Sequence, residues 1–147
     1  MQEGELEARR RAALATIFDT VATQMVERVV AEAVRASNFF GLSGELAERY
    51  GRSIHATFPS ALDALVEPDP VGRDRKLENV VASVRQVSEQ HHVPAIIERG
   101  LVSIAFGFAR RLTRERAGPS GFTADELDAE LTAFQTDFER KLRQLAE

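Results

Sequence analysis

The sequence predicts an all-α protein with a single domain over residues 1–147, and three observations support this prediction. Apolar residues recur at three- and four-residue steps through five segments, which is the period of an amphipathic helix. Proline, glycine or capping residues separate most of these segments. No stretch shows the two-residue alternation that is typical of a strand. We therefore expect a helical bundle of five or more helices, of which the last two are long.

The first segment extends from Leu6 to about Ala36 and contains neither proline nor glycine. Its apolar spacing predicts one long amphipathic helix, or two helices joined by a bend that no residue marks. The stretch 38–44 contains two glycines and ends this segment. Within that stretch, Ser43 is the predicted N-cap of the next helix.

The second segment forms one apolar stripe at intervals of four residues: Leu46, Tyr50, Ile54, Phe58 and Leu62. Pro59 lies inside this stripe. Proline lacks a backbone donor, and its ring crowds the carbonyl of the residue four positions earlier, so we expect a kink in a single helix that ends near Val66. The turn 67–72 follows and contains two prolines and a glycine, which stops the helix.

The next segment runs from about Arg73 to His91 and places six residues on one face: Leu77, Val80, Val81, Val84, Val87 and His91. Pro94 suits the first turn of the helix that follows, because its missing N–H would have no partner there. His91 is therefore expected either to point into the core or to cap carbonyls at the end of its helix.

The last two helices are predicted from Ala95 to about Arg116 and from Thr123 to Leu145. The first of them is apolar almost all round: Leu101, Val102, Ile104, Ala105, Phe106, Phe108, Ala109 and Leu112. A surface helix of a monomer rarely shows this pattern, so we expect the helix to be covered on two sides. The second begins with a capping box at Thr123–Glu126.

Composition and charge argue against several classes of protein. The chain has no cysteine, which excludes disulfides, thiolate zinc sites and cysteine nucleophiles. Its net charge of −4 argues against a nucleic-acid partner. We expect no membrane partner and a cytoplasmic location, because no long uncharged apolar window and no signal-peptide pattern occur. No nucleophile elbow or phosphate-binding loop is found, so we expect no catalytic residues and no enzymatic activity.

The order and lengths of these helices resemble the globin fold. The corner His91–Pro94, the long apolar helix after it, the turn 118–122 and the final helix look like the FG corner, G helix, GH turn and H helix of globins. The segment Tyr50–Ile54 looks like the globin E helix around its distal position. Among globins, the chain most resembles bacterial sensor domains, namely globin-coupled sensors and the N-terminal domains of stressosome RsbR-type proteins. This resemblance implies a role in signal transduction or stress response.

Two registers place different residues at the proximal position of that family. Laid on the family's corner without a gap, the chain has Ser88 there, and a serine hydroxyl is a poor ligand for heme iron. In the other register Val84, Val87 and His91 reproduce the spacing before a proximal histidine, and His91 is the metal ligand of a heme b. The heme contacts would then be His91, Tyr50, Ile54, Phe40 and Val87. We favour the heme-free register, with no cofactor.

A track of small residues lies on the long apolar helix at Gly100, Ser103 and Gly107. Such a track lets another helix approach closely, either within the chain or across a two-fold axis. The sensor families pair their last two helices in a dimer, and this resemblance favours a homodimer. The predicted interface consists of Gly100, Ser103, Ile104, Gly107, Phe108, Phe134 and Phe138.

The sequence thus predicts a globin-like sensory or regulatory domain that dimerises and passes small helix shifts to a downstream signalling domain or protein. Two alternatives remain. One is a heme protein that senses a gas or binds oxygen, with His91 as the proximal ligand. The other is a structural helical adaptor whose pocket is filled by Phe58, Phe106 and Phe134.

Overall fold

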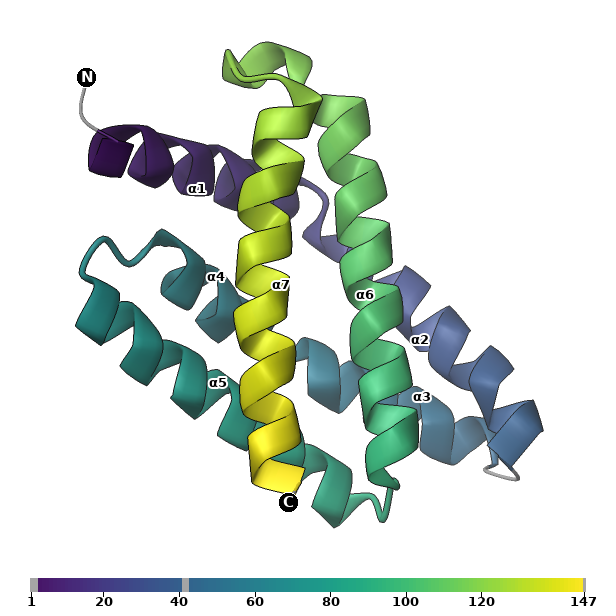
Figure 1. Ribbon diagram of the computed structural model, residues 1–147. Coiled ribbons are helices and arrows are strands. Elements are labelled where there is room, and N and C mark those ends of the chain that lie inside the picture. The colour runs from purple at the N-terminus through teal and green to yellow at the C-terminus, as the bar shows by residue number, and fades with distance from the viewer. Residues whose placement is uncertain (1–2, 41–42, 147) are drawn as a thin grey trace.

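The computed structural model describes residues 3–40 and 43–146, except for the side chains of residues 26, 29, 33, 36–40 and 146. These ranges form seven α-helices and one short 3₁₀ helix (Figure 1): α1 (Glu3–Thr20), α2 (Ala22–Phe40), α3 (Gly44–His55), α4 (Phe58–Val66), α5 (Pro70–Gln90), α6 (Ala95–Arg116), η1 (Gly118–Ser120) and α7 (Ala124–Ala146). They contain no strand, so the predicted all-α class with two long final helices is confirmed.

Helices α6 and α7 lie side by side and run in opposite directions across the front of the molecule in Figure 1. Helices α4 and α5 lie on the α7 side of this pair, and α2 and α3 lie on the α6 side. Helix α6 also contacts α1 and α2. The coverage that we expected for this apolar helix therefore comes largely from its own chain.

The first segment consists of two helices, so the alternative with a bend is confirmed. The break falls at Val21, whose N–H donates to the carbonyl of Phe18 over 3.3 Å and whose carbonyl accepts from the N–H of Met25. All three side chains are buried. Burial of the joint explains why no proline or glycine marks it, since tertiary packing, and not local propensity, favours the bend.

The second segment is broken, and the expectation of a kinked single helix is wrong. Helix α3 ends at His55, where the N–H of Ala56 and the N–H of Thr57 close the last turn on Arg52 and Ile54. Helix α4 starts at Phe58 with Pro59 in its first turn. Starting a new helix removes both the missing hydrogen bond and the clash that Pro59 would have caused. Ser43 caps α3 as predicted, since its Oγ accepts from the N–H of Leu46.

Helix α5 begins at Pro70, three residues before the predicted start, because Asp69 acts as its N-cap and accepts from the N–H of Gly72 over 3.0 Å. Its buried face consists of Leu77, Val80, Val81, Val84 and Ser88. The predicted face continued instead through Val87 and His91, which are only half-buried. The difference arises because the helix ends at Gln90, so His91 does not extend the stripe.

The final helix starts with the predicted capping box. The N–H of Glu126 donates to Oγ1 of Thr123 over 3.1 Å, and the N–H of Thr123 donates to Oε1 of Glu126 over 3.0 Å. Pro94 precedes α6 as its N-cap residue and not as part of its first turn. Both long helices therefore begin at N-cap residues that can be identified in the sequence.

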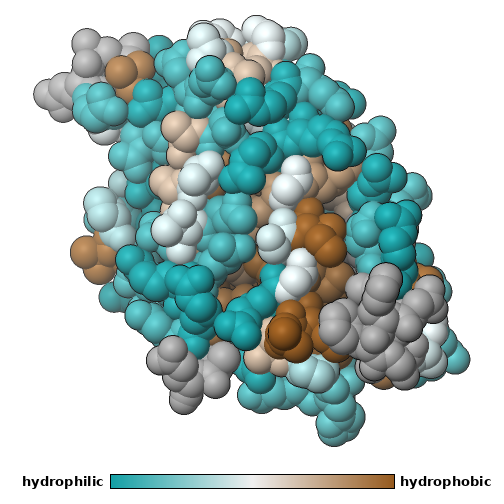
Figure 2. Space-filling model, turned by 45° about the vertical axis from the view of Figure 1, so that its right-hand side comes forward, coloured by the Kyte–Doolittle hydropathy of each residue, from teal (hydrophilic) through white to brown (hydrophobic). Residues whose placement is uncertain are grey.

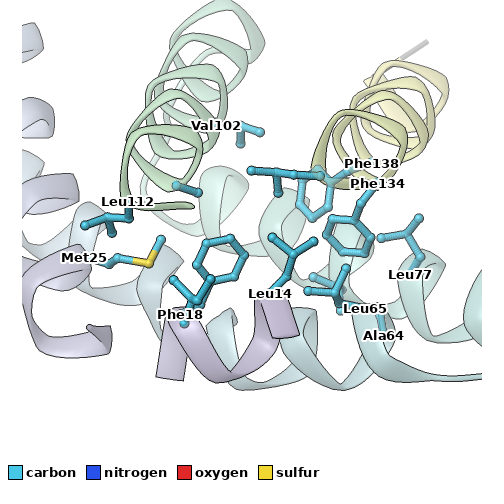
Figure 3. Close-up of a cluster of buried hydrophobic side chains, with 14 of the residues drawn as sticks. Leu14, Phe18, Met25, Ala64, Leu65, Leu77, Val102, Leu112, Phe134 and Phe138 are labelled. Carbon is cyan, nitrogen blue, oxygen red and sulfur yellow. The ribbon is translucent and has the colours of Figure 1, made fainter. Parts of the chain in front are cut away.

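Side chains from α1, α2, α4, α5, α6 and α7 meet in one main core. Figure 3 shows ten of them, including Leu14 and Phe18 from α1, Met25 from α2 and Phe134 and Phe138 from α7. A smaller cluster lies around Tyr50 and is bridged to the main core by Ile54. Within the part of the chain that the structure describes, no helix has both the length and the apolar character needed to cross a bilayer.

Candidate functional site

An apolar cavity of about 120 Å³ lies beside the junction of α3 and α4. Each of the helices α1 to α7 provides at least one residue of its wall. The lining residues are Phe18, Met25, Ile54, His55, Thr57, Phe58, Ala61, Leu62, Leu65, Val84, Leu101, Val102, Ala105, Phe106, Ala109, Leu131, Phe134 and Phe138. The break between the two helices forms part of this wall. The cavity is therefore a candidate ligand site built at a helix junction.

Ser88 occupies the inward position on α5 that the ungapped register assigns to the proximal residue. Its side chain is fully buried, and its Oγ lies 3.2 Å from the carbonyl of Val84 and 2.7 Å from the hydroxyl of Tyr50. Because the Ser88 hydroxyl donates to Val84, the Tyr50 hydroxyl donates to Ser88. Two neutral side chains that satisfy each other thus meet at this buried position.

Helix α5 ends in a Schellman motif that explains the pair His91-His92. The N–H of Val93 donates to the carbonyl of Ser88 over 2.8 Å, and the N–H of His92 donates to Glu89 over 3.1 Å. His92 has the positive φ of 57° that this motif requires at the residue after the cap. His91 is the cap residue itself. The two histidines therefore terminate the helix through their backbone.

The imidazole of His91 lies against Tyr50 and not in the cavity. The two ring centroids are 5.9 Å apart with an edge-on geometry of 70°. His91 is half-buried and does not line the cavity. Of the other predicted heme contacts, Ile54 lines the cavity, while Tyr50 and Val87 do not. The side chain of Phe40 lies outside the described part of the chain.

The cavity does not fit a heme coordinated by His91. Its volume of about 120 Å³ is well below the roughly 300–1,000 Å³ of pockets that take drug-sized or larger ligands. His91 does not line it, and its ring lies against Tyr50, which does not line it either. The three phenylalanines predicted to fill a pocket, Phe58, Phe106 and Phe134, line this cavity and leave it open.

Burial raises the pKa of Tyr50 to about 12. Tyr50 is the only tyrosine of the chain, and there is no tryptophan. Its ionisation can therefore be followed by absorbance without interference from another phenol. The raised pKa also means that the folded state binds its phenolic proton more tightly than the unfolded state does.

We expect the tyrosinate absorbance of the folded protein to appear near pH 12, compared with a pH near the ordinary value of 10.0 in denaturant. The contribution of the raised pKa to the free energy of unfolding is fully present below pH 10 and is lost as the pH rises through 12. The loss amounts to roughly 3 kcal/mol. Stopped-flow absorbance after a pH jump, before unfolding, measures the folded value. A folded-state midpoint near 10 would contradict the burial of the hydroxyl.

A buried ion pair lies next to this tyrosine, and the sequence analysis missed it. Glu98 is fully buried, and its Oε1 accepts from Nη1 of Arg85 over 3.0 Å. The other carboxylate oxygen, Oε2, has no hydrogen-bond partner among the described residues. Glu98 looked like an acidic residue in the first turn of α6, which is ordinary helix chemistry. Its burial depends on α5 packing over it, so no sequence signal could reveal it.

The predicted interface residues separate into three sets by burial. Gly100, Ser103, Ile104 and Gly107 are exposed on α6, and Figure 2, which looks from the α6 side, shows white and brown atoms gathered in a band within a teal surface. Phe108 is half-buried beneath the guanidinium of Arg28, 5.3 Å from its ring centroid. The remaining two, Phe134 and Phe138, are buried in the core of the chain. Only the first set is available for a helix partner as the chain stands.

His55, the third histidine, lies at the edge of the cavity. Its ring stacks on Phe58 with a centroid distance of 5.1 Å, and burial lowers its pKa. Over residues 3–40 and 43–146, no three histidine or acidic side chains converge in a way that could hold a metal ion. His55 and His91 belong to different clusters, so the chain does not bring its histidines together.

No family model, no curated protein and no solved structure matches this chain. The likeness to sensor globins therefore rests on the residues of the sequence alone. The structure adds three features: a buried Ser88–Tyr50 hydrogen bond, an apolar cavity at the α3–α4 junction, and exposed small residues along α6.

Proposed function

We propose that this chain is a heme-free sensory or regulatory domain with a globin-like order of helices, and that two copies associate along α6. Two features support the proposal. In the ungapped register the proximal position falls on Ser88, whose hydroxyl is a poor ligand for iron and is already hydrogen-bonded to Tyr50. The exposed face of α6 carries Gly100, Ser103, Ile104 and Gly107 in a continuous track. Such a domain would transmit its signal as a shift of packed helices to a downstream domain or protein.

The single observation that carries the association is the open space around two glycines. An added Cβ at Gly100 or at Gly107 would meet no described atom within 4 Å. Packing among the described side chains thus gives neither position a reason to be glycine. Each is in the interior of a 22-residue helix, where glycine is about 0.5–1 kcal/mol less favourable than alanine. Close approach of a second helix gives a physical reason for both.

We expect Gly100→Ala with Gly107→Ala to change stability and association in opposite directions. The double variant should unfold at a higher temperature when dilute, because two helix-interior glycines are removed; the gain is about 1–2 kcal/mol. Its association should weaken by about tenfold or more, because the new methyl groups hold the partner helix away. Circular dichroism melts at low concentration and sedimentation equilibrium over a concentration series measure the two effects.

Gly4→Ala is the matched control. Gly4 is also exposed and helical with open space around it, but it lies in α1. This variant should leave association unchanged. A wild-type chain that stays monomeric at all concentrations would refute the association, as would a double variant that associates as tightly as the wild type.

Titration with heme b tests the heme-free part of the proposal. We expect no Soret band characteristic of a coordinated heme, because His91 caps α5 and does not line the cavity. The absorbance should match that of free heme and be the same for His91→Ala. A stoichiometric Soret band that is lost in His91→Ala would instead establish the gas-sensing or oxygen-binding alternative. Association along α6 can be measured separately and does not depend on this result.

A further inference from the structure

We infer that the cavity beside the α3–α4 junction is a binding site for a small, uncharged, apolar molecule of about the size of one benzene ring. This inference rests on the proposed function in one respect, because it names the class of signal that the domain would sense. The binding itself follows from the size, chemistry and position of the cavity.

The size suits a single small molecule. The volume of about 120 Å³ approaches that of an engineered cavity of about 150 Å³ in another protein, which is lined by leucine, isoleucine and phenylalanine, stays dry, and binds benzene or xenon. Close-packed interiors rarely contain voids of this size, and those that exist destabilise the fold. An occupant would recover the dispersion contacts that the lining side chains lack.

The chemistry of the wall selects an uncharged apolar occupant. The described lining residues include no lysine, arginine, aspartate or glutamate, so a carboxylate or phosphate would have no counter-charge. The hydroxyl of Thr57 already donates to the carbonyl of Ile54 over 2.6 Å. The ring of His55 is stacked on Phe58. The space is partly open to solvent, but water there would find few of the two to four polar partners that it needs, so an apolar occupant can displace it.

An entry route exists at the helix junction. His55, Thr57, Phe58 and Ala61 line the cavity and are also half-buried at the surface. His55 is the last residue of α3, and Thr57 lies in the connection. Phe58 and Ala61 lie in the first turn of the nine-residue helix α4. A short helix that starts at a break can move more easily than a long one, because fewer contacts hold it. An occupant can therefore pass this junction without unfolding the long helices.

The cavity also adjoins the helix that carries the proposed interface. Leu101, Val102, Ala105 and Phe106 of α6 line the cavity, and Gly107 follows directly on the exposed side. The ring of Phe106 contacts Phe138 edge-on at 5.5 Å. An occupant that moves Phe106 would act on the same helix that a second copy approaches. This position gives the occupant a direct physical connection to association.

Benzene is the probe, and Ala109→Leu is the test variant. Ala109 is buried and lines the cavity, so a leucine there fills the space that benzene would occupy. Ala82→Leu is the matched control, because Ala82 is exposed on α5 and does not line the cavity. Ala61→Leu, at the half-buried part of the wall, serves as a second filling variant in case Ala109→Leu does not fold.

In the wild-type chain and in Ala82→Leu we expect a saturable rise in melting temperature and saturable shifts of methyl NMR signals, with one benzene per chain. A folded filling variant should bind benzene about tenfold more weakly or not at all. Absence of saturable binding in the wild type would overturn the inference. Equal binding in the filled and unfilled chains would also overturn it. Association measured without benzene tests the proposed function separately, so the two can fail independently.

Discussion

Replacing Arg85 with methionine is expected to destabilise the protein by about 3–5 kcal/mol, because it leaves the carboxylate of Glu98 buried without its partner. Glu98 is fully buried, and the side chain of Arg85 is 21% exposed, so water cannot fully replace the guanidinium. The second carboxylate oxygen already lacks a hydrogen bond among the described residues. Urea denaturation followed by circular dichroism gives the change in the free energy of unfolding.

Two further variants show whether the loss comes from the stranded charge. In the double variant Arg85→Met with Glu98→Leu, most of the stability should return, because replacing both members of a buried pair is often neutral. Arg49→Met is the surface control, since Arg49 forms an exposed pair with Glu45 at 2.7 Å, and exposed pairs contribute about 0–1 kcal/mol. If Arg85→Met were no more destabilising than Arg49→Met, the buried pair would not exist as described.

Phe138→Ala is the second substitution with a large expected effect, a loss of about 3–5 kcal/mol. Phe138 is buried, and its ring contacts Phe106 at 5.5 Å and Phe134 at 6.4 Å. It also lines the cavity, so its truncation adds to an existing void that the neighbouring rings cannot easily fill. The measurement is the midpoint of urea denaturation, with the slope checked for two-state behaviour.

Leu145→Ala is the control on the same helix. Leu145 is 51% exposed near the end of α7, and its truncation should change the free energy of unfolding by less than about 0.5 kcal/mol. The comparison also separates two roles of Phe138. A small loss in Phe138→Ala would mean that the ring is not part of the core and faces a partner instead, as the sequence-based interface assumed.

The helices and most of their ends follow from local chemistry. Ser43 and the Thr123–Glu126 box cap their helices through hydrogen bonds that span only three residues. Apolar periodicity predicts α5, α6 and α7 for the same reason, because each pattern lies within one helix. Pro59 shows where local reasoning stops. Its chemistry predicts a disturbance, but whether the chain kinks or starts a new helix depends on what packs around it.

The candidate site is less predictable, because its parts are far apart in the sequence. Tyr50 and Ser88 are separated by 38 residues, and their hydrogen bond needs α3 and α5 to pack together. The sequence marked both residues but could not choose between Ser88 and His91 as the inward-facing one. The Schellman motif at the end of α5 places Ser88 inside and makes His91 the cap. A cavity is even harder to predict from the sequence, because its size depends on how all the surrounding side chains pack.

The amino-acid pattern alone determined the helical class and the two long final helices, because helix period and capping act over three or four residues. Only the tertiary structure decided which side of each helix is covered by its own chain. It buried Phe134, Phe138 and Glu98, and it left Gly100 and Gly107 without a described side chain near the position of an added Cβ. Burial is a sum of contacts between distant segments, and that sum exists only once the helices have packed.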